Sequence, residues 1–337
     1  MFKRLLIAIL IIALGVVVFN RVNKNETMNE LLEKSNPETR EYFHPMAIEG
    51  LRQREYPGSE IIIEETLTKG TNYSRYIASY MSEGNKIYGL LTIPDNDKPE
   101  EGFPIIAFIH GYIDPKIYQT TSRYVEYQDG LAREGFITYK IDLRGHGNSE
   151  GKAVNGHFSE AYVVDTLNSI ASLKKLPEAD ASKIGIWGHS NGGEIGLRSM
   201  VVSKEIKAGV FWAGVVGSFE GMLETYNNKI GFLYLGRGTP ELVKENNLPS
   251  KNPGFWKKID PYFYLEGISG EIQLHHGTTD ESVPIDTSQE LVAAMEKIGR
   301  EVEYFEYPGA NHNLSNPAFG SAMQRTVEFF KKQLNQE

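Results

Sequence analysis

The chain reads Lys183-Ile184-Gly185-Ile186-Trp187-Gly188-His189-Ser190-Asn191-Gly192-Gly193, a short apolar run that stops at a serine framed by glycines. The run has the composition of a buried strand, and a helical repeat of apolar and small residues follows it. The spacing Gly188-x-Ser190-x-Gly192 is typical of a nucleophile elbow, in which the glycines let strand and helix approach closely. The sequence therefore predicts a strand, a sharp turn and a helix that expose the Ser190 hydroxyl. The backbone amide of Asn191 is then placed to stabilise negative charge on a reacting oxygen.

A second serine has the same glycine spacing, in Gly147-Asn148-Ser149-Glu150-Gly151. Glycine accounts for 33 of the 337 residues, so a pattern with two glycines arises easily by chance. Ser149 follows a polar, glycine-containing loop and leads into a segment without a helical period. We therefore expect Ser190, and not Ser149, to be the nucleophile.

Apolar runs alternate with helical patterns through most of the chain. Alternation of this kind is typical of a mostly parallel sheet with helices on both faces. Three earlier runs, separated by turn sequences, predict antiparallel hairpins. The predicted strands span residues 60–67, 73–80, 86–93, 104–109, 136–141, 184–187, 208–213, 272–275 and 301–307, and the predicted helices span residues 122–134, 159–173, 288–298 and 318–334.

The N-terminus carries an uncharged, apolar run over residues 5–19, directly after Lys3 and Arg4. A helix of this length is about 22 Å long, close to the thickness that a bilayer can accommodate. We favour an uncleaved membrane anchor over residues 1–22 rather than a signal peptide, because a cleavage site with small residues lies only inside the apolar run. The basic residues at the start favour an extracytoplasmic catalytic domain.

The remaining chain divides into two predicted parts. Residues 23–85 form a polar stalk and a β extension, and residues 86–337 form the catalytic domain. The segment 217–269 is rich in aromatic residues and is longer than an ordinary connection. It is predicted to be a helical cap over the serine. The alternative, an insertion that packs its aromatic side chains on the body, explains the composition equally well.

Composition narrows the classes of function. The net charge of −9 and the lack of a basic stripe argue against a nucleic acid partner. The chain has no cysteine, so disulfides and thiolate catalysis are excluded. Its 8 histidines show no spacing typical of metal ligands. We expect neither a metal nor a cofactor.

A serine nucleophile needs a histidine to take its proton and a carboxylate to orient that histidine. Asp280 and His312 each follow a predicted strand in a loop, so both can reach the carboxyl edge of the sheet. The order serine, aspartate, histidine is that of hydrolases with a nucleophile elbow. Glu281 and Asp286 are rival carboxylates in the same loop.

The second oxyanion donor is predicted in the sequence Phe108-Ile109-His110-Gly111-Tyr112. Gly111 permits a tight turn that directs the amide of Tyr112 toward the serine, and the Tyr112 hydroxyl is a further candidate. The alternative for Tyr112 is an ordinary surface aromatic. His110 is expected to support the loop through hydrogen bonds.

With these residues in place, the chain from about residue 86 to residue 334 resembles the prolyl oligopeptidase-type serine peptidases of the α/β-hydrolase superfamily. The resemblance rests on His110-Gly111-Tyr112, Asp142-Leu143-Arg144-Gly145-His146-Gly147, Gly188-His189-Ser190-Asn191-Gly192-Gly193, His276-Gly277-Thr278-Thr279-Asp280 with Val283-Pro284, and Tyr307-Pro308-Gly309-Ala310-Asn311-His312. It implies an α/β-hydrolase fold with Ser190, Asp280 and His312 as the catalytic triad.

Two departures from the family bear on the substrate. Residues 23–85 are too few for the β-propeller that usually precedes the hydrolase domain, and Asn191 stands where the family often has tyrosine or methionine. The resemblance implies a serine peptidase that acts on small peptides. A carboxylesterase acting on small esters is the alternative, and a non-catalytic, membrane-tethered binding protein is a more distant one.

Overall fold

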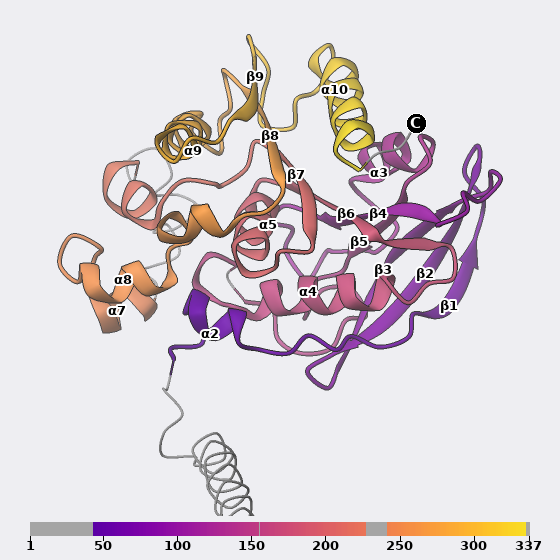
Figure 1. Cartoon of the computed structure of the whole chain (residues 1–337), viewed down its shortest axis with the longest axis horizontal. Helices are drawn as coiled ribbons and strands as arrows, with labels where there is room; N and C mark the ends of the chain where they lie inside the picture. Colours follow the sequence, from indigo (N-terminus) through magenta and orange to yellow (C-terminus); the bar gives the residue numbers. More distant parts are fainter. Residues whose placement is uncertain (1–42, 155, 227–240, 335–337) are drawn as a thin grey trace, which may run out of the picture. The chain divides into compact units, whose positions relative to one another are not determined.

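The centre of the computed structural model is a twisted sheet flanked by helices (Figure 1). The structure describes residues 43–154, 156–226 and 241–334, and within them the sheet has nine strands. Their order across the sheet is β1-β2-β3-β5-β4-β6-β7-β8-β9. The strands are β1 (Ile62–Leu67), β2 (Tyr73–Ser82), β3 (Asn85–Pro94), β4 (Phe103–Ile109), β5 (Ile137–Ile141), β6 (Ala179–His189), β7 (Ile206–Trp212), β8 (Glu271–Gly277) and β9 (Val302–Tyr307).

The sheet is parallel from β5 to β9 and antiparallel over its first three strands. This confirms the predicted mostly parallel sheet and the predicted hairpins. The β2–β3 hairpin joins the parallel part through β3 and β5, with Gly89 opposite Ile141. Every residue of β4 and β5 is buried, which explains the uninterrupted apolar run of β4, while β5 also buries Thr138 and Lys140.

Helices cover both faces of the sheet. One hydrophobic cluster joins the sheet to α4, α5 and α9, and a second joins its other face to α3 and α10. Four of these helices, α3, α4, α9 and α10, correspond to the helices predicted over residues 122–134, 159–173, 288–298 and 318–334. The helices are α2 (Ile48–Arg52), α3 (Val125–Ala132), η2 (Gly156–Phe158), α4 (Ala161–Leu173), α5 (Asn191–Val202), η3 (Gly221–Thr225), α7 (Glu241–Asn246), α8 (Pro253–Ile259), η4 (Pro261–Gly267), α9 (Asp286–Lys297) and α10 (Ala318–Gln333).

The short helix α2 packs against α5. Ile48 and Leu51 are fully buried, and Arg198 of α5 donates a hydrogen bond of 3.2 Å to the carbonyl of Met46. The predicted membrane segment, residues 1–22, lies outside the described residues. Over the described ranges, the structure contains no helix with both the length and the apolar character that a bilayer crossing requires.

The predicted cap segment, residues 217–269, consists of short helices where the structure describes it. Residues 227–240 within it lie outside the description. Phe219 and Trp256 are buried in a cluster with Met46 and Val283, so these two aromatic side chains pack on the body. This agrees with the second interpretation of the aromatic composition, for the residues that the structure describes.

Candidate active site

Ser190 occupies the turn between β6 and α5 in a strained backbone conformation. Its φ of 54° and ψ of −119° lie outside the ordinary regions for a side chain with a Cβ atom. The turn is held because the Ser190 amide donates to Trp212 O at 3.0 Å and its carbonyl accepts from Val215 N at 2.9 Å. A Cβ on Gly188 would lie 2.4 Å from the carbonyl oxygen of Gly192, so this position requires glycine. The strain therefore comes from the predicted sharp turn between strand and helix.

Two backbone segments beside Ser190 can supply oxyanion donors. Asn191 is the first residue of α5, where an amide has no acceptor within the helix. The other segment follows β4, where a Cβ added to Gly111 would lie 3.0 Å from the Ser190 Cβ. The peptide between Gly111 and Tyr112 therefore runs directly against the nucleophile. The Tyr112 side chain is 49% exposed, as the surface interpretation expected, although the residue lines the pocket at Ser190.

The imidazole of His312 contacts the carboxylate of Asp280. His312 Nδ1 lies 2.8 Å from Asp280 Oδ2, and both residues sit in loops after neighbouring strands, β9 and β8. The rival Glu281 accepts a hydrogen bond from the backbone amide of His312 at 3.2 Å and does not orient its ring. Asp286 opens helix α9. Of the three candidate carboxylates, Asp280 is the one placed to orient the imidazole.

Asp280 is itself held by four hydrogen bonds. Its Oδ1 accepts from the amides of Ser282 and Val283, each at 2.8 Å, and its Oδ2 accepts from His276 Nε2 at 3.2 Å in addition to His312. Burial alone would raise the pKa of Asp280, but the hydrogen bonds from His276 and His312 lower it well below its usual value. The group is therefore a fixed carboxylate near neutral pH. The role of His276 was not predicted from the sequence.

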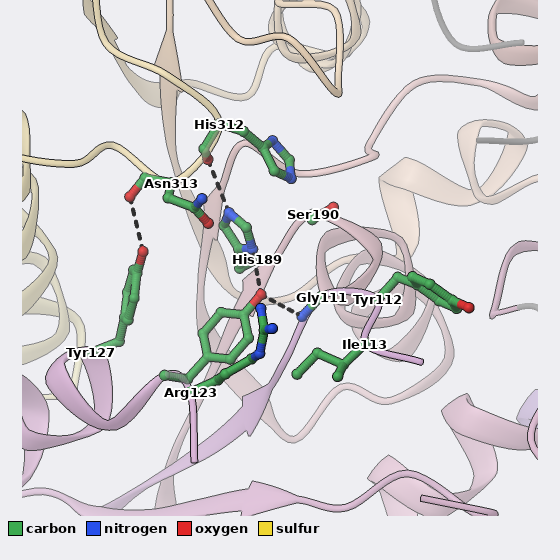
Figure 2. Close-up of a pocket in the computed structure, with 10 residues that line it drawn as sticks. Gly111, Tyr112, Ile113, Arg123, Tyr127, His189, Ser190, His312 and Asn313 are labelled. Atoms are coloured by element: carbon green, nitrogen blue, oxygen red, sulfur yellow. Dashed lines mark hydrogen bonds between the residues drawn. The ribbon is translucent and has the colours of Figure 1, made fainter. Parts of the chain in front are cut away.

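Ser190 and His312 line one pocket of about 320 Å³ (Figure 2). Figure 2 shows the His312 ring above the Ser190 side chain at the same opening. No described residue of segment 217–269 lines it. The complete lining is Gly111, Tyr112, Ile113, Arg123, Tyr124, Tyr127, His189, Ser190, His312 and Asn313.

A chain of hydrogen bonds joins the two sides of this pocket. The Gly111 amide donates to the Tyr124 hydroxyl at 3.0 Å, that hydroxyl lies 2.7 Å from His189 Nδ1, and His189 Nε2 lies 3.0 Å from the carbonyl oxygen of His312. Burial lowers the pKa of His189 to about 3, so its ring is neutral. Since the carbonyl can only accept, Nε2 carries the proton and Nδ1 accepts from Tyr124. The dashed lines in Figure 2 mark this chain.

Sequence reasoning recognised His189 as part of the elbow but missed Tyr124. Tyr124 lies far from both partners in sequence, and a tyrosine before a short helix carries no motif. Its φ of 56°, together with 52° at Arg123, is visible only in the folded chain.

Ser149, the alternative serine, is buried and fully engaged in the fold. Its hydroxyl donates to the carbonyl of Asp142 at 2.6 Å and accepts from the Tyr88 amide at 2.9 Å. It therefore links the loop after β5 to β3. His110 is also structural, since its Nδ1 donates to the Gly111 carbonyl at 2.6 Å and burial lowers its pKa to about 3.

Comparisons with known proteins match this chain to a peptidase family. The sequence profile of the prolyl oligopeptidase family matches residues 124–337. The uncharacterized peptidase YuxL of Bacillus subtilis is 25% identical over 239 residues, which cover 69% of this chain and 34% of YuxL. The chain thus spans about a third of the length of this relative.

Solved structures share the fold. An acylaminoacyl peptidase from Pyrococcus horikoshii superposes with a TM-score of 0.62 at 22% identity, over 80% of this chain and 43% of the other. Acetyl xylan esterase 1 from Thermoanaerobacterium sp. superposes with a TM-score of 0.62 at 18% identity, over 84% of this chain and 90% of the other. Peptidases and esterases therefore both have this α/β-hydrolase fold.

Proposed function

This chain belongs to the prolyl oligopeptidase family of serine peptidases, and on that premise we propose that Ser190, His312 and Asp280 form its catalytic triad. Ser190 is the nucleophile, His312 the general base and acid, and Asp280 the carboxylate that orients the imidazole. The amides of Asn191 and Tyr112 are the oxyanion donors. The observation that carries the proposal is the 2.8 Å contact between His312 and Asp280, at a pocket that also contains the strained Ser190.

The reaction proceeds in two stages. His312 Nε2 takes the proton of Ser190 as Oγ bonds to the substrate carbonyl carbon, and the carbonyl oxygen becomes an oxyanion held by the two amides. The protonated imidazole then gives its proton to the leaving atom, and the bond from carbon to that atom breaks. Water, deprotonated by His312, attacks the acyl-enzyme, and the acid leaves as Ser190 recovers its proton.

A fluorophosphonate probe tests the nucleophile. The wild type is expected to be labelled, and Ser190→Ala is not. Ser149→Ala is the matched control, because Ser149 has the same glycine spacing but lies outside the pocket, and it should keep its label. Equal labelling of wild type and Ser190→Ala would refute the assignment.

We propose small peptides as the substrate, since the family and the relative YuxL are peptidases. The alternative is a carboxylesterase, favoured by the acetyl xylan esterase that superposes over 90% of its own length. Activity profiling against paired peptide and ester libraries separates the two. Hydrolysis of p-nitrophenyl esters without cleavage of any peptide would favour the esterase. A well-folded protein that no acylating probe labels would instead favour a non-catalytic binding protein.

We also propose that residues 1–22 anchor the protein in a membrane with the catalytic domain, residues 86–337, outside the cytoplasm. The proposal rests on the apolar run over residues 5–19 and the basic residues before it. Alkaline carbonate extraction of the full chain and of a variant without residues 1–22 tests it. The full chain should stay with membranes and the shortened one should not. Protease treatment of intact cells should degrade the catalytic domain.

A further inference from the structure

We propose that Arg123 selects substrates whose leaving portion carries a carboxylate, which in a peptide is the free C-terminus. The proposal rests on the assigned roles of Ser190 and His312 and names the substrate class for that same site. Arg123 lines the pocket that contains both residues, and Figure 2 shows its guanidinium among the pocket side chains.

Arg123 and His312 line the same pocket at the nucleophile. Tyr127 of α3 donates a hydrogen bond of 2.9 Å to the carbonyl of Asn313, so the loop that carries His312 is docked on the helix that follows Arg123. A general acid must lie within hydrogen-bond reach of the atom that it protonates. The leaving portion of a substrate therefore occupies the pocket that His312 lines, and Arg123 lines that pocket too.

The backbone at Arg123 is held in an unfavourable conformation. Arg123 and Tyr124 have φ values of 52° and 56°, the left-handed region that costs free energy for residues other than glycine. The fully buried Lys140 fixes this turn, because its Nζ donates to the carbonyls of Ser122 at 3.0 Å and of Arg123 at 3.2 Å. The turn delivers the Tyr124 hydroxyl to His189 and the Arg123 side chain to the pocket. The hydrogen bonds from Lys140 therefore fix the backbone that positions the Arg123 side chain.

The charge of Arg123 is available to a ligand. Within the described residues its guanidinium forms no ion pair or side-chain hydrogen bond. The two carboxylates that contact His312 are engaged there, since Asp280 accepts from two histidines and Glu281 accepts from the His312 amide. The guanidinium fork matches the two oxygens of a carboxylate, and one such contact is charge-assisted. A carboxylate on the leaving portion is therefore the ligand that this position fits.

Two aryl acetates test the proposal without assuming peptide or ester specificity. 4-Carboxyphenyl acetate and 4-carbamoylphenyl acetate deliver the same acetyl group and differ in the charge of the leaving phenol. For each variant, kcat/KM is measured with both acetates, and the value for the carboxylate is divided by the value for the carboxamide. Dividing this ratio by the same ratio in Arg123→Gln cancels the difference in intrinsic reactivity between the two phenol esters. We expect about a tenfold preference for the carboxylate in the wild type, and a partial preference in Arg123→Lys. The preference should shrink as salt concentration rises, because the arginine is exposed.

Arg133→Gln is the matched control. Arg133 lies just after α3, is half exposed and pairs with Asp129 outside the pocket, so this variant should keep the wild-type ratio. Equal ratios in wild type and Arg123→Gln would overturn the proposal, as would an equal change in Arg133→Gln. If the triad assignment were wrong, the result would be different, because Ser190→Ala would hydrolyse both acetates as fast as the wild type. A matching pair of acetylated alanine tripeptides, ending in a carboxylate or a carboxamide, extends the test to peptides.

Discussion

The hydroxyl of Tyr124 lies 2.7 Å from Nδ1 of His189, and through this contact the loop after β4 is connected to the loop that carries His312. Neither residue belongs to the proposed triad. Their hydrogen bonds hold the Gly111 amide on one side of Ser190 and the His312 carbonyl on the other. The two halves of the proposed catalytic apparatus therefore share one support.

Tyr124→Phe is expected to lower kcat about tenfold with little change in KM. The substitution keeps the ring but removes the acceptor of the Gly111 amide and the donor to His189, and each lost bond to a buried partner costs about 1–2 kcal/mol. Steady-state hydrolysis of p-nitrophenyl acetate measures both constants, and thermal unfolding shows whether the fold survives. Tyr56→Phe is the comparison variant, because it removes a hydroxyl that donates to the carbonyl of Leu51, outside the pocket. A wild-type kcat in Tyr124→Phe would contradict the positioning role.

Asp280→Asn is expected to lower kcat by about 10³-fold or more, because the amide no longer fixes the tautomer of His312 that accepts the serine proton. Glu281→Gln should have a small effect, since within residues 43–154, 156–226 and 241–334 the Glu281 carboxylate accepts a hydrogen bond from the backbone amide of His312 and none from its ring. Pre-steady-state acylation by a p-nitrophenyl ester measures the step directly. If Glu281→Gln were the more damaging of the two, the carboxylate assignment would be wrong.

Ser149→Ala is expected to destabilise the protein by about 1–2 kcal/mol while its fluorophosphonate label is retained. The alanine leaves the Tyr88 amide and the Asp142 carbonyl without their partner. Urea unfolding measures the loss. A fully stable Ser149→Ala variant that also lost its label would reverse the roles of the two serines.

Stability is expected to depend on pH through His275. Its ring is buried between Tyr307 and Gln273, and burial lowers its pKa to about 3 from a usual value near 6.5. The unfolded chain thus binds a proton at this position between about pH 6.5 and 3 that the folded chain does not. Its contribution to stability is complete above pH 6.5 and decreases as the pH falls, by at most about 1.4 kcal/mol per pH unit.

Urea unfolding of the wild type and of His275→Gln at a series of pH values tests this expectation. The free energy of unfolding should fall less steeply with acidification in His275→Gln, which has no group to protonate there. Comparing the two slopes separates His275 from the other buried titratable groups, among them Asp142, whose pKa burial raises to about 6. Parallel curves would show that His275 does not contribute.

Much of the fold could be predicted because its determinants are local. The buried strand β4 is apolar throughout, and Gly188 and Gly192 mark the turn at Ser190 by their positions alone. The candidate residues Asp280 and His312 could be named because each follows a strand whose carboxyl end reaches the same edge of the sheet. Their contact at 2.8 Å is a property of the folded chain.

Other features had no local signal. The choice among Asp280, Glu281 and Asp286 depended on where a loop turns, and His276 became a partner of Asp280 only through that turn. The interpretation of segment 217–269 likewise depended on which surface Phe219 and Trp256 cover.

By itself, the sequence determined the succession of strands and helices and the residue types at the proposed catalytic positions, because periodicity, glycine and charge act between residues close together in the chain. Only the tertiary structure decided that Tyr124 bridges Gly111 and His189, and that Arg123 lines the same pocket as His312. Those contacts join segments brought together by packing. The strained turn at residues 123–124 persists because Lys140, on a neighbouring strand, holds it.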